Sequence, residues 1–328
     1  MPIPGVVAVG AVAALAWIAG TRVPLIGAPV LALTVGLIAR NLAGAHPALQ
    51  PGVEFTLKRL LRLAIILFGA TLSFGQVIRI GAASFAVIAV AIVLALGLTY
   101  AFGRWLGAPP GLVTLIGVGT AICGATAIIT VGPIIESKDE EVAFAVTTIF
   151  LFNMLAVLVY PLLGHALALS DSTYGIWAGT AIHDTSSVLA ASFAFSEPAG
   201  KVATVVKLTR TLALVPLALI YGVAHSYARS RAGAAAGTGV NLAKIFPWFI
   251  LWFVVAALLN TWGLVSAGVG AGASLAGKFL VVMVMAAVGF SADLRRMHEI
   301  GLRPLYIGLV ASVVIAVVSI ALIRVLIG

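Results

Sequence analysis

Long apolar segments follow one another along almost the whole chain, and they constrain its fold more than any other feature. A helix needs about 20 apolar residues to cross a bilayer, and the sequence supplies roughly eleven such segments. We place them at residues 3–20, 24–39, 60–78, 82–103, 110–135, 142–163, 173–196, 202–224, 245–264, 274–292 and 304–327. They are rich in Val, Ile, Leu and Ala without strand-like alternation, which favours helices. We predict an all-α integral membrane protein.

The linkers between these segments are short and leave no room for a soluble domain. Only 9% of the residues are charged, whereas about one quarter are charged in a soluble protein. We therefore expect a single multi-pass transmembrane domain over residues 1–328, with approximate halves 1–163 and 164–328. The longest linker, 226–244, contains RSRAGAAAGTG and is typical of a flexible loop. The first twenty residues lack Lys and Arg, so we expect a retained span rather than a signal peptide.

Basic residues are unevenly divided between the two sides of the expected membrane. One side holds Arg40, Lys58, Arg59, Arg62, Arg104, Arg229, Arg231, Lys244, Arg295, Arg296 and Arg303, and the other holds Arg22, Arg79, Lys138, Lys201, Lys278 and Arg324. Cytoplasmic loops are enriched in Lys and Arg. We predict a cytoplasmic N-terminus and an external C-terminus. The net charge of +9 indicates contact with anionic membrane lipid rather than with nucleic acid.

A short polar phrase occurs twice inside this apolar sequence. Gly119–Thr126 reads GTAICGAT and Gly179–Ser186 reads GTAIHDTS, each near the middle of its segment. Paired, interrupted segments at membrane depth are typical of a transporter's substrate site, where half-helix N-termini face an anion. Close helix packing by small residues is the alternative explanation. We predict substrate binding by Gly119, Thr120, Cys123, Gly124, Thr126, Gly179, Thr180, Thr185 and Ser186.

The two copies allow two topologies. If each segment crosses the bilayer, the copies run parallel, because one span, 142–163, separates them. If each is a re-entrant hairpin, they enter from opposite faces and form an inverted pair. The charge bias does not choose between the models, because two hairpins cancel in the crossing count. The loop Glu136–Glu141 changes sides between them, but acidic residues carry little information on orientation. Inverted repeats are common in transporters, and we favour them.

The second copy carries adjacent ionisable residues, His183 and Asp184, in mid-segment. They lie ~16 Å from either end of the span at 1.5 Å per residue. An aspartate at that depth must face a cavity, bind a cation, pair or be protonated. A histidine beside a carboxylate suits proton coupling. We predict that His183 and Asp184 couple transport to protons or sodium, with a buried ion pair that only fixes packing as the alternative.

Two cations follow in the next segment. Lys207 and Arg210 are spaced i and i+3 and share a helix face. Together they suit a divalent anion, which Arg210 can bind through its bidentate fork. The alternative is that one cation pairs with Asp184 while the other reaches the headgroups. We favour anion contact. Asn153, in mid-span, is a weaker polar candidate.

The sequence lacks the common signatures of enzymes and metal proteins. The single cysteine, Cys123, excludes an intrachain disulfide and a cysteine-rich metal site. There is no Walker loop, HExxH or GxSxG motif. We expect no cofactor, no metal and no catalysis. An intramembrane enzyme that uses Cys123 or His183, and a passive channel, are the less favoured alternatives.

Several ordered motifs resemble those of a known family. GTAICGATAI, ESKDEEVAFAV, YPLLGHALALSD, WAGTAIHDTSSVLAA and GKVATVVKLTR resemble the YeiH-like inner-membrane proteins, a bacterial family of proposed sulfate exporters. The similarity covers nearly the whole chain and is densest over 117–216. That family is grouped with the cation–proton antiporters and anion transporters. The resemblance implies inverted repeats, discontinuous or re-entrant helices, and a core that moves against a scaffold, as in an elevator.

The resemblance also implies functional roles for the positions that match the family's motifs: Gly119, Thr120, Cys123, Gly124, Gly179, Thr180, His183, Asp184, Thr185, Lys207 and Arg210. Gly124-Ala125-Thr126 stands where that family often shows GAS, a change that keeps the hydroxyl. We therefore expect a secondary active transporter in the bacterial cytoplasmic membrane. It would export a small anion, sulfate or an organosulfonate, coupled to a proton or sodium gradient. The alternative is a cation–proton antiporter, and a homodimer is left open.

Overall fold

The computed structural model describes residues 2–22, 27–44, 46–231, 242–295 and 301–326, and within these ranges it is helical without strands. Six helices in the described part are long and apolar enough to cross a bilayer: α1 (Ile3–Gly20), α5 (Phe74–Trp105), α8 (Asp139–Ala166), α11 with α12 (Glu197–Leu212, Leu214–Arg231), α15 (Ala267–Ser291) and α17 (Leu302–Leu326). The shorter helices are α2 (Gly27–Ala43), α3 (Gln50–Phe55), the π-helical turn η1 (Thr56–Leu60), α4 (Leu61–Gly69), α6 (Pro110–Ala121), α7 (Ala125–Ile134), α9 (Asp171–Ala181), α10 (Thr185–Phe195), α13 (Leu242–Ile245) and α14 (Trp248–Thr261). The predicted all-α integral membrane fold is confirmed.

One expected boundary is wrong. The predicted span 60–78 ends as a helix at Gly69, and α5 starts at Phe74 and includes the whole of 82–103. Ser73 caps α5: its hydroxyl accepts from the Gln76 amide at 3.2 Å, and the Gln76 side chain accepts from the Ser73 amide at 2.9 Å. This capping box is a helix-start signal that apolar character alone does not reveal.

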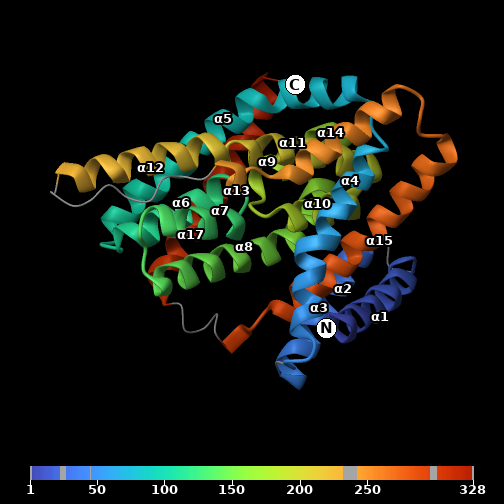
Figure 1. Cartoon of the computed structure of the whole chain (residues 1–328), viewed down its shortest axis with the longest axis horizontal. Coiled ribbons are helices and arrows are strands. Elements are labelled where there is room, and N and C mark those ends of the chain that lie inside the picture. Colours follow the sequence, from blue (N-terminus) through green and yellow to red (C-terminus); the bar gives the residue numbers. More distant parts are fainter. Residues whose placement is uncertain (1, 23–26, 45, 232–241, 296–300, 327–328) are drawn as a thin grey trace.

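The helices form two groups that meet along a shared apolar boundary (Figure 1). In the first group, α1, α3, α4 and α14 pack around the crossing of α2 and α15. That crossing is close: a Cβ added to Gly36 would lie 2.5 Å from the Ala286 carbonyl oxygen, and one added to Gly289 would lie 2.4 Å from that of Leu33. Small residues permit such approach between membrane helices.

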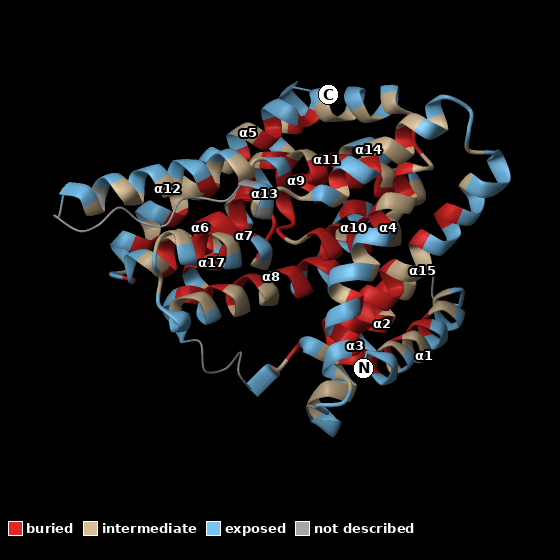
Figure 2. Ribbon diagram, viewed as in Figure 1, coloured by how far each residue is buried: buried red, intermediate tan, exposed pale blue. Residues whose placement is uncertain are grey.

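The second group contains α5 to α11 and α17. Its buried residues concentrate around α6, α9, α10 and α11 (Figure 2). Leu189 of α10 and Leu208 of α11 pack into the apolar core of the first group. The predicted division into a core and a scaffold, and the movement of one against the other, stay predictions.

Polar contacts define two opposite ends of the bundle. At one end, which we call the Glu136 end, Arg229 at the end of α12 forms an ion pair with Glu136. At the other, the Glu197 end, Lys201 pairs with Glu197 at 3.1 Å. Helix α8 runs from the first end to the second, since it follows Glu136 in the chain and leads to Asp171, which accepts a hydrogen bond from Ser196 at 2.5 Å.

The two polar phrases lie at the tips of two helical hairpins. In the first, α6 and α7 run back along each other: a Cβ on Gly119 would lie 2.8 Å from Ile128, and one on Gly132 would lie 3.9 Å from Leu115. In the second, α9 and α10 do the same, with the rings of Tyr174 and Phe195 stacked at 3.9 Å. Both segments therefore return to the end of the bundle from which they enter.

The hairpins enter from opposite ends, the first from the Glu136 end and the second from the Glu197 end. This arrangement places Lys138 with the richer set of basic residues and corrects its assignment to the poorer set. Of the other residues in that assignment, Arg296 and the side chain of Lys244 lie outside the described residues, as do residues 232–241 of the predicted loop. An inverted-repeat relationship between the halves of the chain stays a prediction.

Candidate functional site

The two hairpin tips touch each other inside the second group. Gly124 has φ +65°, and a Cβ added to it would lie 3.4 Å from the Asp184 Cβ. A side chain at this position would combine strained backbone with crowding, so Gly allows the turn. As a result, the C-terminal ends of α6 and α9 and the N-terminal ends of α7 and α10 converge on one region.

Asp184 caps α10. Its Oδ2 accepts from the backbone amides of Ser186 at 2.9 Å and Ser187 at 3.3 Å, and from the Ser186 hydroxyl. From α8, Asn153 Oδ1 accepts from the backbone amides of His183 at 3.1 Å and Asp184 at 3.0 Å. The weaker sequence candidate Asn153 thus fixes the position of the tip.

Lys207 and Arg210, on α11, bind the C-terminal ends of both α6 and α9. The Lys207 ammonium donates to the carbonyl oxygens of Ile122 at 2.8 Å and Ile182 at 3.0 Å, and also to that of His183. Arg210 donates to a larger set of carbonyls, those of Ala121 at 2.7 Å and Ile182 at 3.3 Å, with Thr120 and Thr180. The two cations therefore neutralise the partial negative charge of two helix C-termini.

This placement differs from the anion contact expected of Lys207 and Arg210. Both side chains are fully buried behind the tips, and neither lines the two cavities that border Asp184. The alternative pairing of one cation with Asp184 is not found there either. Direct contact with a substrate stays an untested prediction for these two residues, and their described contacts are all with protein.

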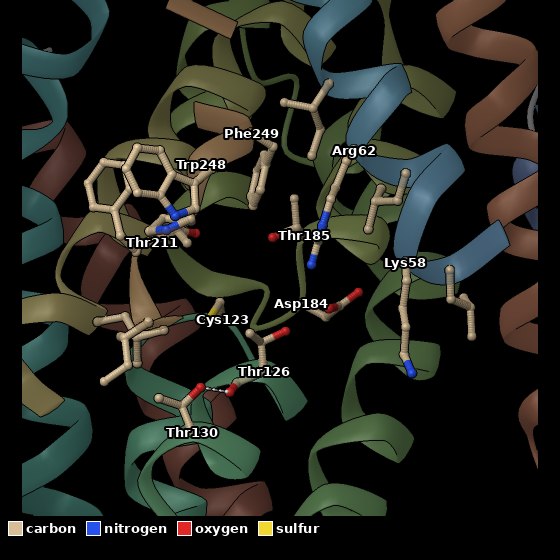
Figure 3. A pocket seen from close by; sticks show the side chains of 17 residues that line it. Lys58, Arg62, Cys123, Thr126, Thr130, Asp184, Thr185, Thr211, Trp248 and Phe249 are labelled. Carbon is tan, nitrogen blue, oxygen red and sulfur yellow. Dashed lines mark hydrogen bonds between the residues drawn. The ribbon is translucent and has the colours of Figure 1, made fainter. Parts of the chain in front are cut away.

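A cavity of about 320 Å³ lies in front of the tips (Figure 3). Its hairpin wall comprises Cys123, Thr126, Thr130, Asp184 and Thr185. The opposite wall, from the first group, includes Lys58, Arg62, Trp248 and Phe249. A second cavity of about 230 Å³ also borders Lys58, Thr126 and Asp184, and adds Asn153, Ser186 and Ser187. The cavities thus lie on the boundary between the two helix groups.

Lys58 and Arg62 were not predicted as site residues. They project toward the cavity from one helix segment, η1 and the start of α4 (Figure 3). Lys58 also forms an exposed ion pair with Glu54 at 3.0 Å. Basic residues near a span end ordinarily indicate orientation, which concealed this role. Their i, i+4 spacing was the available signal, because it places both on one helix face.

His183 and Asp184 face different spaces. The His183 Nε2 lies 2.8 Å from the Ser312 hydroxyl of α17, and the ring borders an apolar groove rather than the cavity. Its Nδ1 has no hydrogen-bond partner among the described residues. The structure therefore does not bring the two side chains together as one proton-transfer unit.

The remaining predicted residues build the tips. Gly119 packs against Ile128, and Gly179 packs against Val206 of α11. A Cβ added to either glycine would lie 2.8 Å from its neighbour. The hydroxyls of Thr120 and Thr180 are buried and have no hydrogen-bond partner among the described residues. These four positions support the turns, whereas Cys123, Thr126, Thr185 and Ser186 border the cavities.

The fold and site define a multi-pass membrane protein with two helical hairpins that meet at their tips. The family model described as conserved hypothetical protein 698 matches residues 4–323. A UPF0324 membrane protein of Clostridium tetani is 37% identical over 304 residues, which is 90% of this chain and 88% of that protein. One from Streptococcus pyogenes serotype M6 is 38% identical over 328 residues, covering 98% and 96%. The chain belongs to this bacterial membrane protein family.

Proposed function

We propose that the protein is a secondary active transporter that exports a small anion, sulfate or an organosulfonate, across the bacterial inner membrane. One observation carries the proposal. The N-terminal residues of α7 and α10 border a cavity that Lys58 and Arg62 close from the opposite side. Helix N-termini and cations both stabilise negative charge, so the cavity suits an oxyanion.

The donors of the cavity match the chemistry of a sulfate or sulfonate group. Arg62 can present two parallel N–H groups to two oxygens, and Lys58 adds a point charge. The hydroxyls of Thr126 and Thr185 supply neutral donors on the hairpin wall. One carboxylate, Asp184, faces these two cations across the same cavity, and Glu54, the partner of Lys58, does not line it. The charged side chains on the cavity wall therefore sum to a positive charge.

Asp184 is the proposed site of the coupling ion. It borders both cavities, and no ion pair to it is found among the described residues. A carboxylate at membrane depth without a cationic partner favours proton or sodium binding. Occupation by either ion would lower the local negative charge and strengthen anion binding.

The position of the cavity supports export as the direction of transport. Trp248 begins α14, whose other end reaches Thr261, which accepts a hydrogen bond from the Phe74 amide at 2.7 Å. Phe74 begins α5, which ends at Trp105 beside the start of α6 at the Glu136 end, so Thr261 lies at the opposite end. The cavity is therefore displaced toward the Glu136 end, which the basic residues predict to be cytoplasmic. We propose that the anion enters from the cytoplasm and that the second helix group then moves against the first.

The test is anion exchange in proteoliposomes, using radiolabelled sulfate and a small alkylsulfonate. Lys58→Gln and Arg62→Gln should each weaken apparent affinity by about tenfold or more, because a hydrogen bond to a charged group contributes roughly 1.5–3 kcal/mol. Arg59→Gln is the matched control, since Arg59 is exposed and lines neither cavity. Equal affinities in all three variants would refute anion binding at this cavity.

A cation–proton antiporter is the second candidate, and the position of Asp184 on both cavities favours it. In that case the liposomes would exchange sodium for protons while labelled anions stay outside. Concentrative, gradient-dependent uptake would exclude a passive channel. We also propose that the protein is not an enzyme. Recovery of the transported anion without any chemical product would support this.

A further inference from the structure

A second, apolar binding space lies on the outer face of the second helix group. It is a groove of about 470 Å³ between α8 and α17, with α9 as its floor. Leu163 on one wall and Val313 and Val317 on the other are 42%, 52% and 60% exposed. Its inner end is closed by the His183–Ser312 contact. This groove is separate from the proposed transport cavity.

The groove spans about one leaflet of a bilayer. Along α17 it runs from Leu309 to Ile320, which is ~16 Å at 1.5 Å per residue, and half of the hydrocarbon thickness is ~15 Å. The contacts of α17 with α9 set its direction: Ser312 meets His183 at the tip, and the Ala316 carbonyl accepts from the Trp177 indole nearer the Glu197 end. The groove therefore opens at the Glu197 end and closes near the midplane.

A cation continues the groove at its open end. Arg324 lies one helical turn beyond Ile320 on α17 and is exposed, so the i, i+4 spacing keeps it on the groove face. No ion pair to Arg324 is found among the described residues. An apolar trough one leaflet deep with a cation at its mouth complements a molecule with a hydrocarbon tail and an anionic head.

We propose that this groove is a specific site for one anionic phospholipid of the leaflet at the Glu197 end. One acyl tail lies between α8 and α17, and its phosphate contacts Arg324. The tail end packs against Ala181 and Ile182, the residues at which α9 ends. A bound lipid would therefore brace the second hairpin from outside.

Fluorescence quenching of Trp177 tests this site. In a variant that keeps Trp177 and replaces the other tryptophans with Phe, the protein is reconstituted in phosphatidylcholine with increasing phosphatidylglycerol brominated deep in its acyl chains. Half-maximal quenching should need a mole fraction of brominated phosphatidylglycerol about fivefold lower than that of brominated phosphatidylcholine. One arginine near a lipid surface provides a preference of about this size for an anionic lipid. Arg324→Gln should remove this preference, whereas Arg303→Gln, at the opposite end of α17, should keep it.

Filling the groove supplies a second, independent readout. Ala316→Leu should lower the maximal quenching, whereas Ala321→Leu, exposed and outside the groove, should not. Quenching that follows mole fraction equally for both lipids would show ordinary boundary lipid and overturn the proposal. Absence of quenching, together with disulfide crosslinking between copies through Val313→Cys in a Cys123→Ala background, would show instead that a second copy fills the groove.

Discussion

Asp184 has two roles that one substitution can separate. As the cap of α10 it accepts from two backbone amides, and as a carboxylate it borders the cavity. Asparagine caps helices about as well as aspartate, whereas alanine costs about 1 kcal/mol. Asp184→Asn should therefore keep the fold but abolish gradient-driven anion uptake, and substrate exchange should continue at least in part. Parallel uptake and exchange assays in proteoliposomes measure this difference.

The control for this variant is Asp184→Ala, which removes the cap together with the charge. It should also lower the unfolding temperature in detergent, whereas Asp184→Asn should not. Gradient-driven uptake that persists in the asparagine variant would rule out Asp184 as the site of the coupling ion.

We expect a substitution of Arg210 to lower the stability of the protein rather than to affect anion binding directly. Its guanidinium reaches carbonyls at the ends of both α6 and α9, and a lysine ammonium cannot reproduce that fork. Arg210→Lys should lower the free energy of unfolding by about 2–3 kcal/mol, the scale of hydrogen bonds to a charged group. Thermal unfolding in detergent measures the loss. Arg59→Lys, on an exposed surface, is the matched control.

An opposite result for Arg210→Lys would be informative. If stability is unchanged while the apparent affinity for sulfate falls, Arg210 contacts the substrate in another state of the protein. The role assigned to it from the sequence would then replace the helix-end role described here.

At the scale of the elements, the hairpin tips depend on a backbone conformation that only glycine adopts without strain. Gly124 has φ +65° beside Asp184 and Ile149. Gly124→Ala should cost on the order of 1–3 kcal/mol of stability and displace the start of α7, with a loss of transport. Gly268→Ala is the control, because an added Cβ there meets nothing within 4 Å. Stability and transport equal to wild type in both variants would contradict the structural role of Gly124.

The breaks in both hairpins were predictable, because Gly, Thr and an aspartate in mid-segment leave few ways to continue a buried helix. Their antiparallel folding was one of two topologies left open by the sequence, because the choice depends on pairs such as Tyr174 and Phe195 that only tertiary structure brings together. The carbonyl partners of Lys207 and Arg210 were hidden for the same reason. Lys58 and Arg62 were overlooked because basic residues near a span end ordinarily report orientation.

At the scale of the whole molecule, the hairpin arrangement places two loops on the sides opposite to those that full crossing would give. Lys138→Cys and Ser172→Cys, each in a Cys123→Ala background, lie at opposite ends of α8 and are exposed. With a cytoplasmic N-terminus, an impermeant maleimide should label the cysteine at position 172 in intact cells. It should label the one at position 138 only after permeabilisation. The reversed pattern would mean either an external N-terminus or segments that cross the bilayer fully.

A third cysteine distinguishes these two explanations. Leu264, between α14 and α15, is 70% exposed, and its predicted side is the same in both hairpin and crossing models because two hairpins cancel in the count. Labelling of Leu264→Cys in intact cells would confirm the cytoplasmic N-terminus. A reversed labelling pattern at positions 138 and 172 would then mean that the segments cross the bilayer fully.

One helix holds both tips, and this limits how the molecule can change shape. Lys207 and Arg210 of α11 each bind carbonyls from both hairpins. Displacing one hairpin alone would leave buried cationic donors without acceptors, at a cost of several kcal/mol. The two hairpins and α11 therefore move together as one unit. In the proposed transport cycle, alternating exposure of the cavity cannot come from two independent gates, and the sliding surface must be the border with α2, α4 and α15.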